Sequence, residues 1–154
     1  MFLGTYAPRL DDKGRLILPA RFRDDLQGGL VITKGQERCL NVYTPAGFAE
    51  LTEDSGRISA TDAAGRAYVR ILFSGAADEV PDKQGRVTIP PRLREYANLT
   101  RDCAVIGARD HIEIWEASAW AAYEAAQEEA YARHSGDLPP ALATIARPGP
   151  PPTA

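Results

Sequence analysis

The stretch DDKGRLILPARFR, residues 11–23, is followed 71 positions later by DKQGRVTIPPRLR, residues 82–94. Both have the form Asp-x-x-Gly-Arg, an apolar residue, any residue, an apolar residue, and then Pro-x-Arg, an apolar residue and Arg. Six positions are identical in the two copies. A repeat of this kind indicates duplicated structural units, and it places any chemistry that the stretch carries at two sites.

The local pattern predicts the same elements in each copy. Asp and Gly suit a tight turn, the alternating apolar residues predict a short half-buried strand, and the proline ends that strand and suits the first turn of a helix. The segments 30–48 and 104–120 have the β-branched and aromatic content of β-hairpins. Each copy therefore predicts strand, turn, strand, short helix, strand, turn, strand and helix.

The remaining segments complete the predicted organisation. We expect helices at about 45–54, at about 61–72 with Thr61 as its N-cap, and over 117–133. The predicted units are a first repeat with its following helices, a second repeat with a C-terminal helix, and a disordered tail rich in proline. Their boundaries are 1–66, 67–136 and 137–154.

Charge is unevenly distributed along the chain. The formal net charge is −3, which does not favour a nucleic-acid partner. Residues 8–23, however, carry five basic residues against two acidic ones, and residues 82–94 carry four against one. Each repeated stretch is thus a basic segment in an acidic protein, and distribution matters more than the total.

Several function classes find no support in the sequence. Cys39 and Cys103 form no metal or redox spacing, and His111 and His134 have no catalytic partner pattern. There is no phosphate loop, nucleophile elbow, zinc signature, apolar run long enough for a membrane span, or secretory leader. We expect a cytoplasmic protein that is not an enzyme, with no cofactor, no metal, no small-molecule substrate and no membrane partner.

The best candidate site residues are the two arginines of the Gly-Arg pairs, Arg15 and Arg86. An arginine at the start of a strand beside an exposed turn suits a fork onto phosphate or onto the O6/N7 edge of guanine. Lys13 and Lys83 lie on the same turns and add charge for backbone contacts. The alternative is structural, with each arginine pairing with the aspartate four residues earlier and clamping the turn.

The other arginines of the repeats are weaker candidates. Residues two apart on a helix do not share a face. One arginine of each Arg-x-Arg pair is therefore expected to face a partner and the other to form a salt bridge. Arg9 has no basic counterpart in the second copy. The remaining DNA-binding candidates are Arg21, Arg92 and Arg9.

These motifs resemble the MraZ family of bacterial transcriptional regulators, which has two tandem SpoVT–AbrB-like domains marked by Asp-x-x-Gly-Arg. The resemblance covers about residues 1–130 and rests on both repeated stretches with their flanking segments. It implies an α+β, β-rich fold in which two swapped-hairpin units form an internal pseudo-dimer, with intervening and C-terminal helices. One departure is local, because the lysine of the second turn stands one position earlier than that of the first.

The resemblance also implies a function. It implies a nucleoid-associated ring, octameric or dodecameric, that binds double-stranded DNA at promoter direct repeats upstream of its own operon, the division and cell-wall gene cluster. Arg15 and Arg86 are then the DNA contacts, with Lys13 and Lys83 beside them. Two alternatives stay open, an AbrB-type antitoxin or transition-state regulator, and a ring-shaped protein-binding scaffold without a specific DNA site.

Overall fold

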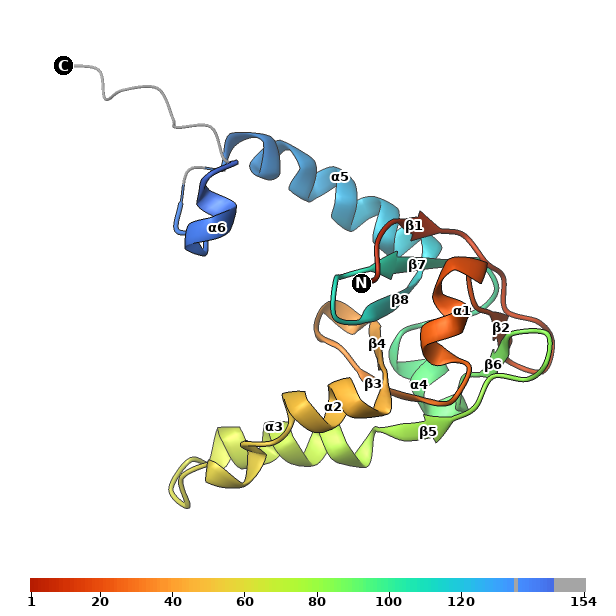
Figure 1. The fold of residues 1–154 in the computed structure, drawn as a ribbon, viewed down its shortest axis with the longest axis horizontal. Helices are drawn as coiled ribbons and strands as arrows, with labels where there is room; N and C mark the ends of the chain where they lie inside the picture. The colour runs from red at the N-terminus through yellow and green to blue at the C-terminus, as the bar shows by residue number, and fades with distance from the viewer. Residues whose placement is uncertain (135, 146–154) are drawn as a thin grey trace. The chain divides into compact units, whose positions relative to one another are not determined.

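The structure is a computed structural model and describes residues 1–134 and 136–145 (Figure 1). The chain divides into two compact units, Met1–Ala117 and Ser118–Ala154. The first unit contains both repeated stretches and every strand of the described residues. Every helix of the described residues is too short or too polar to span a membrane.

The elements follow the predicted order in both repeats. The first repeat forms β1 (Thr5–Tyr6), β2 (Arg15–Ile17), α1 (Ala20–Leu26), β3 (Leu30–Lys34), β4 (Leu40–Tyr43) and α2 (Pro45–Leu51), with 3-10 turns at Gln36–Arg38 and Ser55–Arg57. The second repeat is preceded by α3 (Ala63–Ser74) and forms β5 (Ala77–Glu79), β6 (Arg86–Thr88), α4 (Pro91–Tyr96), β7 (Cys103–Gly107) and β8 (Ile112–Glu116). Two helices follow, α5 (Ala117–Arg133) and α6 (Pro140–Ala143).

The strands of the two repeats interleave in one antiparallel sheet. Its order is β1-β7-β8-β4-β3-β5. The hairpins β3-β4 and β7-β8 meet at the centre through β4 and β8, and the first strand of each repeat pairs with the hairpin of the other. The predicted α+β fold with an internal pseudo-dimer is therefore confirmed. The predicted boundary between 66 and 67 stays a prediction, because the repeats share a sheet and the boundary lies within α3.

A separate two-stranded ribbon joins β2 to β6, again one strand from each repeat. Leu16 pairs with Val87 at its centre, so the ribbon is nearly symmetric about that pair. The inner face is the apolar one that the period-2 pattern predicts, and it joins the main core with Phe22 of α1 and Leu93 of α4. Each proline of the repeated stretch stands one position before the helix rather than in its first turn.

The helices between the repeats differ in detail from the prediction. The predicted N-cap of α3 at Thr61 is wrong, because Asp62 is the cap and its carboxylate accepts the Gly65 N–H at 2.8 Å. The Thr61 hydroxyl instead pairs with the Ser59 hydroxyl at 3.0 Å. A carboxylate also suits the positive end of the helix dipole better than a hydroxyl does. The helix predicted at about 45–54 ends earlier, at Leu51.

The second unit begins with most of α5, whose bounds agree with the predicted 117–133. Its last described element is α6, a single turn that starts at Pro140. The predicted tail at 137–154 lies partly outside the described residues, and its predicted disorder stays a prediction.

Candidate nucleic-acid interface

The two Asp-x-x-Gly-Arg turns have the same geometry. In the first, one Asp11 oxygen accepts the backbone N–H groups of Lys13 and Arg15, both at 2.9 Å. The Gly14 N–H donates to the Asp11 carbonyl at 3.0 Å, and the φ of Gly14 is +75°. A positive φ is the conformation that glycine accepts most readily. The aspartate side chain therefore organises the turn, as the sequence predicts.

The second turn repeats these contacts residue for residue. One Asp82 oxygen accepts the N–H groups of Gln84 and Arg86, both at 2.9 Å, and the φ of Gly85 is +78°. Gln84 thus occupies the place of Lys13, and Lys83 occupies the place of Asp12. The two lysines are therefore not structural equivalents, and the two turns present their positive charge differently.

Each Gly-Arg arginine forms the ion pair expected of the structural interpretation. The Arg15 Nε donates to Asp11 at 2.7 Å, and the Arg86 Nε donates to Asp82 at 2.6 Å. About 30% of each arginine side chain stays exposed. The terminal guanidinium nitrogens of these two arginines form no hydrogen bond with another described residue. Clamping the turn and presenting a guanidinium fork are thus compatible in the same side chain.

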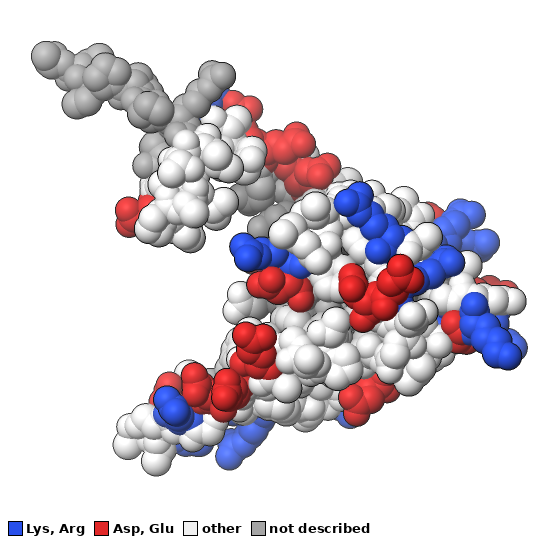
Figure 2. Space-filling view, in the orientation of Figure 1, with Lys and Arg blue, Asp and Glu red and all other residues white. Residues whose placement is uncertain are grey.

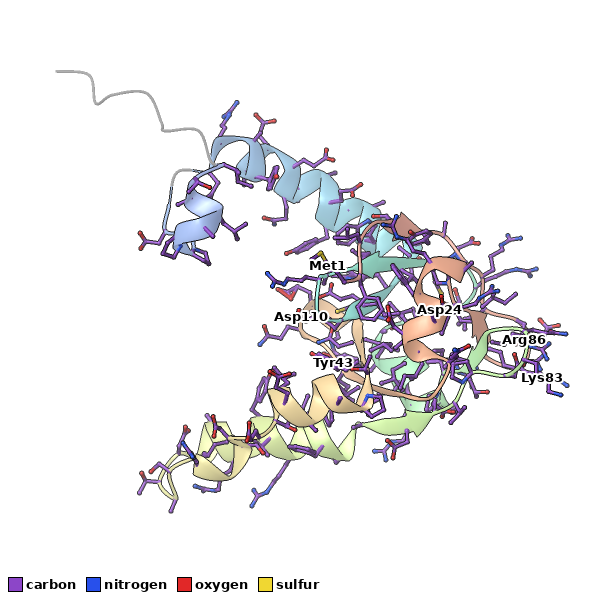
Figure 3. All side chains as sticks on the ribbon, viewed as in Figure 1. Met1, Asp24, Tyr43, Lys83, Arg86 and Asp110 are labelled. Atoms are coloured by element: carbon purple, nitrogen blue, oxygen red, sulfur yellow. The ribbon has the colours of Figure 1, made fainter. Side chains whose placement is uncertain are left out.

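Both arginines lie on the outer face of the β2–β6 ribbon. Arg15 pairs with Thr88 across the ribbon, and Ile17 pairs with Arg86. The intervening residues, Leu16 and Val87, point into the core, so the outer side chains come from alternate positions of both strands. Figure 3 shows Arg86 and Lys83 pointing outward from this edge of the first unit.

The electrostatics of the turns keep the aspartates charged. Hydrogen bonds from the Arg15 backbone and side chain, and from the Lys13 backbone, lower the pKa of Asp11. The pKa of Asp82 is lowered in the same way, chiefly by the Arg86 backbone N–H. Figure 2 shows Lys and Arg atoms gathered at the edge of the first unit where the β5–β6 connection lies in Figure 1. Both aspartates are thus ionised at neutral pH, as their ion pairs with Arg15 and Arg86 require.

The Arg-x-Arg pairs separate into one exposed and one half-buried residue. Arg21 on α1 and Arg92 on α4 are exposed and form no hydrogen bond or ion pair with another described residue. Arg23 and Arg94 do not form the predicted salt bridge. Their Nε atoms donate to the backbone carbonyls of Leu18 and Ile89, each at 3.0 Å. A carbonyl in reach of a half-buried guanidinium takes the place of a carboxylate.

Arg9 lies outside the ribbon and is engaged elsewhere. Its Nε donates to Asp102 at 2.8 Å, in a pair whose two side chains are both more than half exposed. A surface pair of this kind is weak and exchanges easily with other partners. The prediction that Arg9 contacts DNA therefore stays a prediction.

Two features of the site were missed in the sequence. Ile17 is 49% exposed on the outer face between the charged turns, and the period-2 pattern, which placed Ile17 beside Arg15, was the signal that could have found it. The second feature is the approach of Arg23 and Arg94 to the turns of the opposite repeat. No local signal reports that contact, because it joins residues far apart in the chain.

The two cysteines offer no nucleophilic site, and the described residues hold no cluster of metal ligands. Both thiols are buried and free, and burial raises the pKa of Cys39 to about 12 and that of Cys103 to about 11. These thiols stay protonated and poorly nucleophilic at neutral pH. Within residues 1–134 and 136–145, no three His, Cys, Asp or Glu side chains cluster as metal ligands would.

Comparisons with known proteins agree with the duplicated architecture. The family described as "MraZ protein, putative antitoxin-like" matches the chain twice, over residues 1–71 and 72–137. The chain is 57% identical to a "Transcriptional regulator MraZ" of Frankia casuarinae over 92% of its own length and 99% of that protein. It is 53% identical to the same-named protein of Thermobifida fusca over the same shares. With the Salinispora tropica protein of that name it shares 59% identity over 86% of its own length and 93% of the relative. Both halves of the chain match the family, and the similarity to these relatives runs through both, so the chain belongs to the MraZ family.

Proposed function

We propose that this protein is a sequence-specific DNA-binding transcriptional regulator that reads DNA with the outer face of the β2–β6 ribbon. The observation that carries the proposal is the placement of Arg15 and Arg86 on one face of a ribbon built from both repeats. The relatives' printed names supply the regulatory role, since each is called a transcriptional regulator.

The ribbon is suited to the major groove of B-DNA. That groove admits a two-stranded β-ribbon, and other DNA-binding proteins use strands in this way. The Nε of each arginine is occupied by its aspartate, which leaves the two terminal nitrogens as a fork for a partner. Such a fork matches the O6/N7 edge of guanine or a phosphate group. Lys13 and Lys83 add contacts to the DNA backbone from the tips of the turns.

The proposed target is a set of direct repeats in the promoter of the protein's own operon, the division and cell-wall gene cluster. The support for this target is membership of the family. The proposed place of action is the nucleoid, in the cytoplasm. A row of direct repeats is best read by several copies held together, because linked weak contacts gain from effective concentration.

The proposed assembly is a closed ring of eight or twelve copies. One apolar surface supports self-association. On α3, Tyr68 and Ile71 are each more than half exposed, and Phe73 is 41% exposed. Beside that helix lies a groove of about 380 Å³ that also contacts Lys34 and Tyr96. Exposed apolar surface of this kind marks interaction sites, and a second copy of the chain is the proposed occupant.

A second candidate function is favoured by the same surface together with the antitoxin-like description of the family. In that case the α3 surface takes an unrelated protein instead of another copy. Light scattering on the purified chain separates the two candidates. A closed oligomer at micromolar concentration supports the ring, and a monomer at that concentration would refute the ring and leave the α3 surface open to an unrelated protein.

The DNA-binding proposal is tested with Arg15→Ala, Arg86→Ala and the double variant. Fluorescence anisotropy measures binding to the protein's own promoter fragment and to a shuffled fragment of equal length. Each lost bidentate contact is expected to cost ~1–3 kcal/mol of binding free energy. Arg57→Ala is the matched control, because Arg57 lies in an exposed 3-10 turn far from the motif in sequence. Unchanged promoter affinity in both single variants would refute the assignment, provided circular dichroism shows that the variants fold.

A further inference from the structure

Arg94 of the second repeat packs against the turn of the first. A methyl group placed on Gly14 would meet the Arg94 guanidinium carbon at 2.6 Å and its Nη1 at 2.7 Å. Both distances are shorter than a van der Waals contact, so the guanidinium covers the one face of the turn that has no side chain. Gly14 is buried although its neighbours in the turn, Asp12 and Lys13, are exposed.

Ile89 completes the connection. Its N–H donates to the Gly14 carbonyl at 2.9 Å, and its carbonyl accepts the Arg94 Nε at 3.0 Å. Gly14, Ile89 and Arg94 therefore form a closed set of contacts, of which the last two belong to the other repeat. The turn that carries Arg15 is held from behind by the second repeat.

The reciprocal contact is present on the second turn. A methyl group on Gly85 would meet the Arg23 Nε at 2.6 Å, and the Leu18 N–H donates to the Gly85 carbonyl at 2.9 Å. The Arg23 Nε donates to the Leu18 carbonyl at 3.0 Å. The same contact thus occurs twice, related by the pseudo-symmetry of the fold, which argues against a chance arrangement.

We propose that Arg23 and Arg94 are positioning residues that act across the repeats, each fixing the DNA-contacting turn of the other repeat. The proposal rests on the proposed function, because it assigns these arginines a part in placing Arg15 and Arg86 for DNA. Each half-buried guanidinium donates to a backbone carbonyl, lies against a glycine and so holds the turn in place. Lysine cannot replace it, because an ammonium lacks the flat surface that covers the glycine.

The first test needs no DNA. Amide hydrogen exchange is measured by NMR on the free protein and on Arg94→Lys and Arg23→Lys. We expect Arg94→Lys to speed exchange about tenfold at Lys13 and Arg15 and to leave Gln84 and Arg86 unchanged. Arg23→Lys should speed exchange at Gln84 and Arg86 and leave Lys13 and Arg15 unchanged. Arg57→Lys is the control. Unchanged exchange at the opposite turn, or faster exchange at the turn of the same repeat only, would overturn the proposal.

The second test asks whether the contact matters for binding. A double-mutant cycle on a single-site duplex combines Arg94→Lys with Arg15→Ala and, separately, with Arg86→Ala. Arg94→Lys alone should weaken binding about tenfold. The loss should largely disappear in the Arg15→Ala background and persist in the Arg86→Ala background. Coupling to Arg86 instead of Arg15 would refute a role across the repeats.

The two tests separate the two levels of the argument. If exchange changes as expected but no variant, including Arg15→Ala, alters promoter binding, the proposed function fails and the contact is structural only, which overturns the positioning role. If Arg15→Ala weakens binding while the exchange of its turn ignores Arg94, the proposed function holds and the positioning role fails. Should Arg94→Lys unfold the protein, Arg94→Gln keeps an amide donor toward the Ile89 carbonyl and gives the same comparison.

Discussion

Replacing Asp11 by asparagine tests whether the Asp11–Arg15 ion pair orients Arg15 for DNA binding. The substitution removes a negative charge from a surface proposed to bind a polyanion. If charge alone determined affinity, Asp11→Asn would strengthen binding, by about two- to threefold. If Asp11 instead holds Arg15 in its binding direction, the same change weakens binding. The two explanations thus differ in sign.

The contacts of Asp11 set the expected size. One oxygen accepts the N–H groups of Lys13 and Arg15 at 2.9 Å, and the other accepts the Arg15 Nε at 2.7 Å. Asparagine keeps one carbonyl oxygen for the two backbone groups, but its amide nitrogen cannot accept from Nε. Asp11→Asn therefore loses the arginine clamp and keeps the turn, whereas Asp11→Ala loses both. We expect binding to fall about 3- to 10-fold for asparagine and about 10- to 100-fold for alanine.

The matched control is Asp12→Asn in the same turn. The Asp12 side chain is exposed and forms no hydrogen bond with another described residue. Loss of its charge should therefore only reduce repulsion and strengthen binding. Anisotropy titrations of wild type and variants on one promoter fragment, each at several salt concentrations, measure the effect. If Arg15 contacts a guanine edge and not a phosphate, the salt dependence of Asp11→Asn should match that of wild type. An Asp11→Asn variant that binds as tightly as Asp12→Asn would show that the ion pair is irrelevant to recognition.

Three further outcomes are expected. Thr33→Val should lower the free energy of unfolding by about 1–3 kcal/mol in urea titrations. It removes the hydrogen bond that the fully buried Thr33 hydroxyl donates to the Leu72 carbonyl at 2.7 Å. Thr100 is exposed, so Thr100→Val should change the free energy of unfolding little. On acidification, the Gln84 amide resonance should stay unchanged from about pH 7 to about pH 5. The reason is that the pKa of Asp82 lies below its ordinary value of 3.8 in the folded protein. The stabilisation by the ionised Asp82 is therefore fully present above pH 3.8 and is lost as the pH falls through the lowered pKa. A titration midpoint above 3.8 would contradict this. Ile17 is the exposed apolar residue of the outer face and is expected to contact a thymine methyl group. Replacing operator thymines by uracil should therefore weaken DNA binding by the wild type roughly threefold at one position and leave DNA binding by Ile17→Thr unchanged. Equal effects on both proteins would exclude this contact.

Much of the fold could be predicted because the chain states its pattern twice. The alternation in the repeated stretch correctly placed Leu16 and Val87 inside and Arg15 and Arg86 outside. The bounds of α5 were also predicted, since a long run of good helix formers needs no tertiary help. The local sequence was enough to predict an element wherever its residue types and their spacing favour only one structure.

Predictions were wrong where neighbouring groups compete. Thr61 and Asp62 are both acceptable N-caps, and the choice depends on which oxygen reaches the Gly65 N–H. The predicted salt bridge of the Arg-x-Arg pairs was wrong because Arg94 finds the Ile89 carbonyl and the surface of Gly14 instead. Both outcomes depend on three-dimensional packing, and the second joins opposite repeats. Sequence spacing alone contains no information about a contact of that kind.

The near symmetry of the ribbon has a consequence for how DNA can be read. A reader with exact two-fold symmetry is matched by inverted half-sites. Here the duplicated turns agree in Asp, Gly and Arg, but Lys13 is matched by Gln84, and Ile17 is matched by Thr88. In the proposed DNA complex, the arginines would offer two equivalent forks while the residues around them differ, which would give each chain a direction along the duplex. Because both turns lie in one chain, such differences can accumulate in one half alone, which a true homodimer does not allow. Arrays of direct repeats require a DNA-binding protein of this directional type, because every protein copy bound to the array must have the same orientation.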